Sequence, residues 1–293
     1  MRVEHFKTIL GVFVFGLAFL LSVLVVPRPA VWDCSFPVGE KNYVTIQDGP
    51  FQTIPSRETL ENEMDACAVD DYQCFIAQYT EEIDADPENY LAYFNRGWYY
   101  NADEQSDKAV KDYTRAIKLA PDDFDSYLNR GIAYENLDKK ELALKDYAKA
   151  IELDPENADG YFYRAGILDD RGNYKKAIAD YTRAIELGGD DAATYYNRAI
   201  SYSNNKEFAK SVADNTRAIE FDPDDADAYY NRANAYADLR RYDNATDDYT
   251  RAIELAPDDA DAYRSRGELY KKTGQADRAA ADFRKARELD PKQ

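Results

Sequence analysis

From residue 90 onward the sequence repeats itself every 34 residues, and this spacing constrains the fold more than any other feature. An arginine returns at this step six times, and a tyrosine stands three residues before each arginine, at Tyr93, Tyr127, Tyr161, Tyr195, Tyr229 and Tyr263. A proline keeps the same step from Pro87 to Pro291, except where Gly189 takes its place. Because a fixed period of this length is typical of stacked helical repeats, the sequence predicts an array of similar units.

Each unit contains two segments with a helical period. In the first segment, Tyr195, Ala199 and Tyr202 share one helical stripe. In the second segment, the corresponding stripe contains Ala245, Tyr249 and Ala252. The proline that follows each second segment would end a helix there, and the acidic pair after it suits the start of the next helix. Two helices per unit are therefore expected, with these stripes forming the core.

The repeated pattern resembles the tetratricopeptide repeat (TPR) family. The matching motif is Y-x-N-R-[GA]-x-x-Y in the first helix and A-x-x-D-Y-x-[RK]-A-I-x-L-x-P in the second, in units 90–123, 124–157, 158–191, 192–225, 226–259 and 260–293. A half-match at residues 76–88 indicates a degenerate unit at 56–89. The resemblance implies an all-α, right-handed solenoid of helix-turn-helix repeats that binds proteins and has no enzymatic activity.

The first 30 residues differ from the repeats. Residues 8–26 carry no charge and, as a helix, would span about 28 Å, close to a bilayer's hydrocarbon core. A basic head with Arg2 and Lys7 predicts a cytoplasmic N-terminus, a membrane anchor and repeats on the periplasmic side. An uncleaved signal anchor is favoured because Arg28 makes Ala30 a poor cleavage site; secretion to the periplasm after cleavage is the alternative. Residues 31–55 are interpreted as a tether.

An aspartate stands sixteen residues after each repeated arginine. Both residues fall on stripes that face the other helix, and an arginine buried there requires a partner because an unpaired buried charge is costly. The spacing therefore predicts six structural ion pairs, within one unit or across neighbouring units. Their arginines are Arg96, Arg130, Arg164, Arg198, Arg232 and Arg266, and their aspartates are Asp112, Asp146, Asp180, Asp214, Asp248 and Asp282.

An asparagine precedes the arginine in four units, about 200° around the helix from the tyrosine, and so points away from the expected core. In some TPR proteins a similar line of asparagines lies in the concave groove and binds the backbone of an extended peptide, so the resemblance implies this role here. The alternative is a solvated amide or a contact between helices. With its neighbours, the expected groove comprises Asn95, Asn129, Asn197, Asn231, Trp98, Phe94, Phe162, Tyr196, Tyr230, Asp125 and Asp227.

Charge limits the possible partners. The formal net charge is -19, which disfavours nucleic acid because phosphate binding needs a basic surface. The single histidine, His5, lies outside the repeats, so no catalytic site, metal, cofactor or small-molecule substrate is expected. The expected groove is acidic and aromatic, with cations only in the last unit, at Arg264, Lys271 and Lys272. A neutral or basic extended segment of an envelope protein is the predicted partner. A structural subunit of an envelope assembly or secretion machine, using the convex face or end helices, is the alternative.

Three cysteines remain, and export would permit a disulfide. Cys67 and Cys74 would lie about 10 Å apart in one straight helix, too far to bridge. Aligned on the repeat, however, they flank a turn between two helices, where the gap could close. The sequence therefore predicts a Cys67–Cys74 disulfide, with Cys34 free or intermolecular. No metal-binding cysteine spacing is present.

Overall fold

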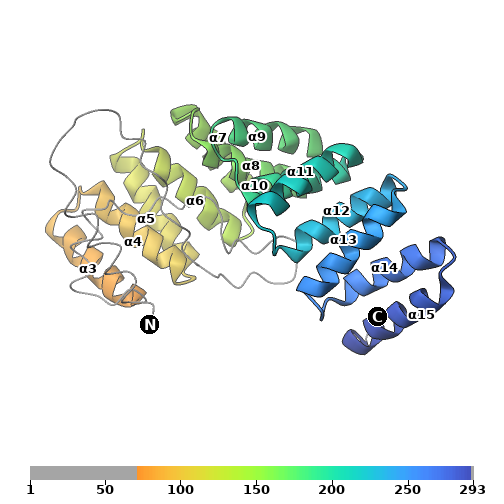
Figure 1. Ribbon diagram of the computed structural model, residues 1–293. Coiled ribbons are helices and arrows are strands. Elements are labelled where there is room, and N and C mark those ends of the chain that lie inside the picture. The colour runs from red at the N-terminus through yellow and green to blue at the C-terminus, as the bar shows by residue number, and fades with distance from the viewer. Residues whose placement is uncertain (1–70, 292–293) are drawn as a thin grey trace, which may run out of the picture. The chain divides into compact units, whose positions relative to one another are not determined.

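The computed structural model describes residues 71–291. Within this range the chain forms thirteen helices and no strand, and Figure 1 shows the helices stacked in chain order. Their bounds are α3 Tyr72–Ala85, α4 Tyr90–Ala102, α5 Ser106–Leu119, α6 Phe124–Asn136, α7 Lys140–Leu153, α8 Ala158–Asp170, α9 Tyr174–Glu186, α10 Ala192–Asn204, α11 Phe208–Phe221, α12 Ala226–Asp238, α13 Tyr242–Leu255, α14 Ala260–Lys272 and α15 Ala276–Leu289.

The helices form pairs that match the period of the sequence. The first helix of each pair, from α4 to α14, begins at the first residue of one of the six expected units, and the second helix packs against it. Successive first helices also touch one another, from α4 through α6, α8 and α10 to α12, while Tyr230 of α12 and Ser265 of α14 are hydrogen-bonded. The first helices therefore form one continuous layer of an all-α solenoid, and we call its outer surface the first-helix face.

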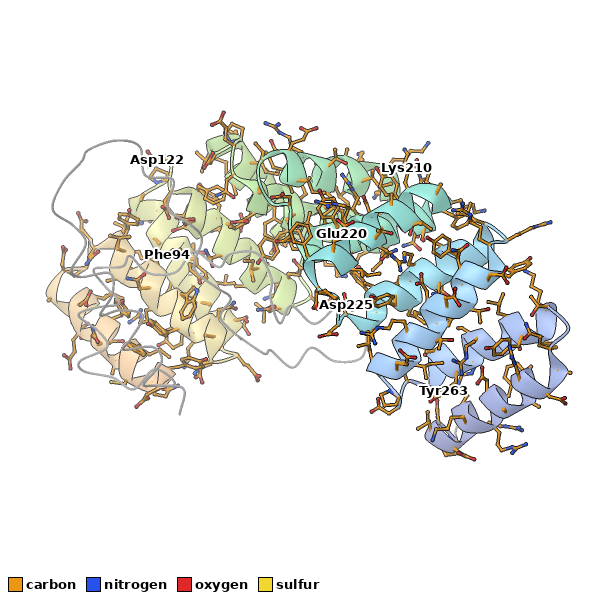
Figure 2. All side chains as sticks on the ribbon, in the orientation of Figure 1. Phe94, Asp122, Lys210, Glu220, Asp225 and Tyr263 are labelled. Atoms are coloured by element: carbon orange, nitrogen blue, oxygen red, sulfur yellow. The ribbon has the colours of Figure 1, made fainter. Side chains whose placement is uncertain are left out.

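Capping side chains begin the first helices. The second aspartate of each acidic pair is the N-cap residue, and its carboxylate accepts a hydrogen bond from a backbone N–H in the first turn, as at Asp123, Asp191, Asp225 and Asp259. Asn89 and Asn157 cap α4 and α8 in the same way. Asp225, labelled in Figure 2, accepts from both Asp227 and Ala228. Much of the negative charge of the turns therefore has a structural role.

The core confirms one expected stripe and corrects the other. Ala245, Tyr249 and Ala252 of the second helix are buried as expected. In the first helix the buried aromatic residue is Tyr196, whereas Tyr195 is only half-buried and stacks on Phe221. The physical reason is a rotation of about 100° between neighbouring helix positions. This rotation turns the repeated tyrosine toward the arginine and the adjacent aromatic residue toward the second helix.

The expected N-terminal anchor, the tether and the first half of the degenerate unit lie outside the described residues. Among helices α3 to α15, none has both the length and the apolar character needed to cross a membrane. Asp71 caps α3 by accepting a hydrogen bond from the backbone N–H of Cys74. Because Cys34 and Cys67 precede residue 71, the Cys67–Cys74 disulfide stays a prediction.

Candidate functional site

All six arginines lie against the aspartates sixteen residues later, within the same unit. In each pair Nε and Nη2 of the arginine donate to the two carboxylate oxygens, and the Nε–Oδ2 distance is 2.6–2.9 Å. This forked geometry matches the planar guanidinium to the carboxylate. The hydrogen bonds that Arg96 donates to Asp112 raise the pKa of the guanidinium and so stabilise its charged form. The pairs join the two helices of a unit and leave no reacting group exposed.

A threonine from the preceding unit adds a third contact to most of these arginines. Arg198 Nη1 donates to Thr182 Oγ1 over 3.1 Å, and the threonine hydroxyl donates to the carbonyl of Ile178 one turn earlier. The same link recurs at Thr80, Thr114, Thr216 and Thr250. Sequence reasoning missed this link, although a threonine sixteen residues before the arginine was a visible signal. Each linked arginine therefore joins three helices and two units.

The third unit lacks this link. Ala148 stands where the other units have threonine, so the Arg164 guanidinium has its aspartate, Asp180, but no hydroxyl from the preceding unit. The Arg164 side chain is 27% exposed, against 13–16% for the other five arginines. The junction between the second and third units is therefore more open to water than the other junctions.

The four predicted groove asparagines occupy two environments. Asn95 and Asn129 are 6% and 3% exposed, and the Asn129 amide donates to the carbonyl of Asp125 in its own helix. Asn197 is half-buried, and Asn231 is half-buried with a side-chain hydrogen bond to Tyr196 of the preceding first helix. The Asn129 amide thus contacts its own helix backbone, and the Asn231 amide contacts a neighbouring helix. In the first two units they are too enclosed to read a peptide without rearrangement.

The predicted aromatic groove residues are also more enclosed than expected. Phe94, Phe162 and Tyr196 are core residues, and Phe94, labelled in Figure 2, packs on Tyr113 of the second helix. Their expected exposure is therefore wrong, because these positions face the second helix. Trp98 and Tyr230 are half-buried, as is Asp125, whereas Asp227 is exposed at the start of α12. The polar and aromatic surface of the first-helix face is accordingly smaller than predicted.

Carboxylates gather on the first-helix face near the middle of the array. Tyr147 donates to Glu135 over 2.8 Å, and Ser201 donates to Asp169 over 2.5 Å. Burial raises the pKa of both carboxyl groups, because loss of hydration disfavours the anion. Lys140, the nearby cation, is paired with Asp170. Glu135 and Asp169 were not predicted as site residues, because their position carries a different residue in each unit.

A cavity lies farther along the same face. It has a volume of about 570 Å³ and is lined by residues from α12, α13 and α14, including Tyr249, Ser265 and Leu269. Arg264, Lys271 and Lys272, the predicted basic end, also line it. The first-helix face therefore changes from acidic in the middle to basic at its end. No group of histidine, cysteine, aspartate and glutamate residues in the range 71–291 is placed to hold a metal ion.

Stacked helix pairs with this layer and these ion pairs define a helical-repeat solenoid. Three family models match the chain. A model described as tetratricopeptide repeat matches residues 124–157 and 226–259, one described as TPR repeat matches 99–138 and 207–240, and a second tetratricopeptide repeat model matches 147–179 and 248–281. Together they cover more than half of the chain. The chain belongs to the tetratricopeptide repeat family.

Solved structures share this fold. The C-terminal part of a TPR repeat-containing protein from Cytophaga hutchinsonii has a TM-score of 0.64 at 21% identity, covering 80% of this chain and 95% of that one. YrrB, described as a TPR protein with an unusual peptide-binding site, has a TM-score of 0.57 at 23% identity, covering 62% and 93%. MamA has a TM-score of 0.53 at 26% identity, covering 55% and 95%. No match is found among curated proteins.

Proposed function

We propose that this protein is a non-enzymatic scaffold that binds an extended segment of a partner protein along the first-helix face. The observation that carries the proposal is the continuous layer of first helices, with half-buried polar and aromatic side chains such as Trp98, Asn197 and Tyr230. The tetratricopeptide repeat fold is in general a scaffold for protein interactions, and YrrB shows that a similar array can carry a peptide-binding site.

The charge of this face favours a neutral or basic segment over most of its length. Glu135, Asp169 and Asp227 carry negative charge there. A cationic peptide would be attracted to this charge, and a neutral peptide would not be repelled by it. Asn197 and Asn231 are the asparagines open enough to contact peptide backbone. We assign the peptide-reading role to these two and leave Asn95 and Asn129 as contacts within the array.

The site of action is the cell envelope in this proposal. The uncharged run at residues 8–26 would hold the protein in a membrane, with the repeats on the periplasmic side, or would be removed on secretion to the periplasm. Membrane fractionation combined with protease accessibility in spheroplasts measures both features. Repeats that stay protected in spheroplasts but are cleaved after lysis would overturn the periplasmic placement.

Affinity capture from solubilised envelopes tests the binding face. The full chain is compared with the double change Asn197→Ala and Asn231→Ala, and with a matched control, Lys111→Ala and Lys145→Ala, on exposed positions of second helices. The proposal expects a protein that is captured by the wild type and the control and lost with the asparagine variant. Loss with the lysine variant alone would favour the alternative, a structural subunit that uses the surface of the second helices.

A further inference from the structure

Two second-helix tyrosines reach the first-helix layer with their hydroxyl groups, whereas the buried hydroxyl of Tyr113 in the first unit has no hydrogen-bond partner in the described range. Tyr147 donates to Glu135 over 2.8 Å, and Tyr249 donates to Asn234 over 2.6 Å. Both acceptors come from the first helix of the same unit, at two different positions of the repeat. A buried tyrosine hydroxyl normally finds such a partner.

Tyr181 is the equivalent residue of the third unit, and it is hydrogen-bonded to neither of the two equivalent positions. Gly166, which has no side chain, stands at the repeat position that Asn234 occupies in the fifth unit. Asp169, whose side chain is one methylene shorter than that of glutamate, stands at the repeat position of Glu135. The Tyr181 side chain is 3% exposed, and its hydroxyl has no hydrogen bond to any residue in the described range. A Cβ added to Gly166 would lie 3.7 Å from this hydroxyl, so the group points at the place where a side chain is absent.

The surroundings of this hydroxyl are negatively charged. The carboxylates that act on Tyr181 are Asp169, Glu135, Asp170 and Asp180; Lys140 pairs with Asp170, and Arg164 pairs with Asp180. Glu135 accepts from the Tyr147 hydroxyl and Asp169 from Ser201 and Asn204, while the charge of Lys140 also acts on Glu135. The hydroxyl and amide donors satisfy lone pairs but do not offset the negative charge, and burial raises the pKa of both carboxyl groups because it removes water from the anions.

The same place in the array is hollow two units later. The cavity of about 570 Å³ is lined by Tyr249 and Ala237, which occupy the repeat positions of Tyr181 and Asp169 two units later. It is also lined by Glu268, which occupies the repeat position of Gly166 three units later. The cavity lining carries three cations, Arg264, Lys271 and Lys272, and one carboxylate, Glu268, whereas carboxylates outnumber cations around Tyr181. The charge at this position of the repeat therefore differs between units.

We propose that Gly166, Tyr181, Asp169 and Glu135 form a subsite for a primary ammonium group, such as that of a lysine side chain on the bound segment. The ammonium donates to the Tyr181 oxygen and to the two carboxylates; the cation that acts on Glu135, Lys140, is already paired with Asp170. The missing side chain at Gly166 gives the ligand access. This inference rests on the proposed function, because the lysine belongs to a segment that lies along the first-helix face.

A small probe tests the subsite without any partner. The full chain is labelled with ¹⁵N-glycine, which gives backbone signals for its 13 glycines, and is titrated with n-butylammonium at constant ionic strength. The Gly166 signal should shift and saturate, while Gly131, enclosed against Tyr147 in the preceding unit, should not. n-Butanol should leave both signals in place, because it lacks the charge.

Tyr181→Phe and Asp169→Asn are the variants that decide the outcome. Each should weaken n-butylammonium binding about tenfold, the effect of losing one hydrogen bond to a charged group. Phe283 stands at the Tyr181 position in the sixth unit, so the phenyl ring alone fits the fold. Tyr249→Phe is the matched control and should bind the probe as the wild type does.

An unsaturable Gly166 shift, or equal affinity in Tyr181→Phe and wild type, would overturn the subsite. So would an equal loss in Tyr249→Phe. If the probe fails while a partner is still captured through Asn197 and Asn231, the subsite is wrong and the proposed function stands. If the probe binds as expected and no partner depends on the first-helix face, the subsite exists and the proposed function is wrong. A saturating shift with n-butylguanidinium would extend the ligand class to arginine.

Discussion

At the scale of single residues, five of the six repeated arginines are fixed from three directions, and Arg164 is the exception. Arg232 is forked against Asp248 of its own unit, donates to Thr216 of the preceding unit and lies over the ring of Tyr229. The aspartate offsets the charge, the threonine joins the units and the ring covers the guanidinium plane. The asparagine beside it has no comparable structural role in every unit, which explains why Tyr163 and Ser265 replace it in two of them.

Replacing Asp248 with asparagine should destabilise the array strongly. Arg232 would keep its charge in a half-buried site and lose its anionic partner, at a cost of about 3 kcal/mol. Urea unfolding monitored by circular dichroism measures the change. Asp247→Asn, at the exposed neighbouring position, is the control and should alter stability by less than about 0.5 kcal/mol. Equal stability of Asp248→Asn and wild type would show that the pair is not needed.

Glu135→Gln should stabilise the protein at neutral pH and not in acid. Burial raises the folded-state pKa of Glu135, so the folded chain favours the protonated form. The stability that this preference provides is present below the ordinary pKa of glutamate, about 4.3, and is lost as pH rises through the folded value. The glutamine oxygen can still accept from Tyr147. Melting temperatures of variant and wild type should differ by several degrees at pH 7 and converge near pH 4; a constant difference contradicts this expectation.

Some residue-level features could be read from the sequence, and others could not. The six Arg–Asp pairs could be predicted, because a charge on an inward stripe requires a partner at fixed spacing. The buried aromatic position could not, because Tyr195 and Tyr196 are both aromatic and only packing shows which one faces α11. The Tyr181 environment was also hidden, since it depends on which side chains of α6, α8 and α10 converge.

At the scale of elements, the turn inside each unit has a fixed backbone conformation. Its residue at the same repeat position has a positive φ in every unit: Gly172 and Gly274 in two units, and Glu104, Asp138, Lys206 and Arg240 in the others. A left-handed conformation costs a non-glycine residue about 1–2 kcal/mol. Four of the six turns therefore carry a strain that glycine would remove.

Arg240→Gly should stabilise the fifth unit. The side chain is exposed at φ 59°, so its removal relieves strain with little loss of packing. We expect a gain of about 1 kcal/mol, measured by thermal unfolding. The reverse change, Gly274→Ala at φ 79°, should cost a similar amount, although nothing lies within 4 Å of an added Cβ. A loss of stability in Arg240→Gly would show that its side chain has an unrecognised role.

The threonine link between units can be tested in both directions. Thr216→Val keeps the shape of the side chain and removes the acceptor for Arg232, so it should cost about 1–2 kcal/mol. Ala148→Thr places a hydroxyl near Arg164 at an exposed position and should add stability. Chemical denaturation of the two variants beside wild type gives both values. A neutral result for both changes would mean that the hydroxyls contribute nothing to the junctions.

At the scale of the whole molecule, contacts run between neighbouring helices and units. The array should therefore tolerate the loss of a complete unit, because the new neighbours meet through equivalent surfaces. Deletion of residues 192–225 should leave a folded, helical protein by circular dichroism and size-exclusion chromatography. Deletion of residues 192–221 breaks the 34-residue register and is the control that should misfold. Equal folding of both would show that register is not what joins the units.

The period also explains why the fold could be predicted more fully than the site. The 34-residue period determines the helix bounds, the pairing of helices and the stacking of units together, and all six units carry the same signal. A binding surface arises instead where units differ, as at Gly166, Asp169 or the cations around the terminal cavity. Such differences carry no repeated signal, so their meaning emerges only when side chains from several units are seen together.

The missing hydroxyl at Ala148 has a mechanical consequence. When the two ends of such an array are pulled apart, every junction carries the same force, and the junction with the fewest connections yields first. The contact between α7 and α8 lacks the arginine–threonine link found at the other arginines and admits more water to Arg164. Under tension the solenoid would therefore part at this junction, leaving a stack on each side intact.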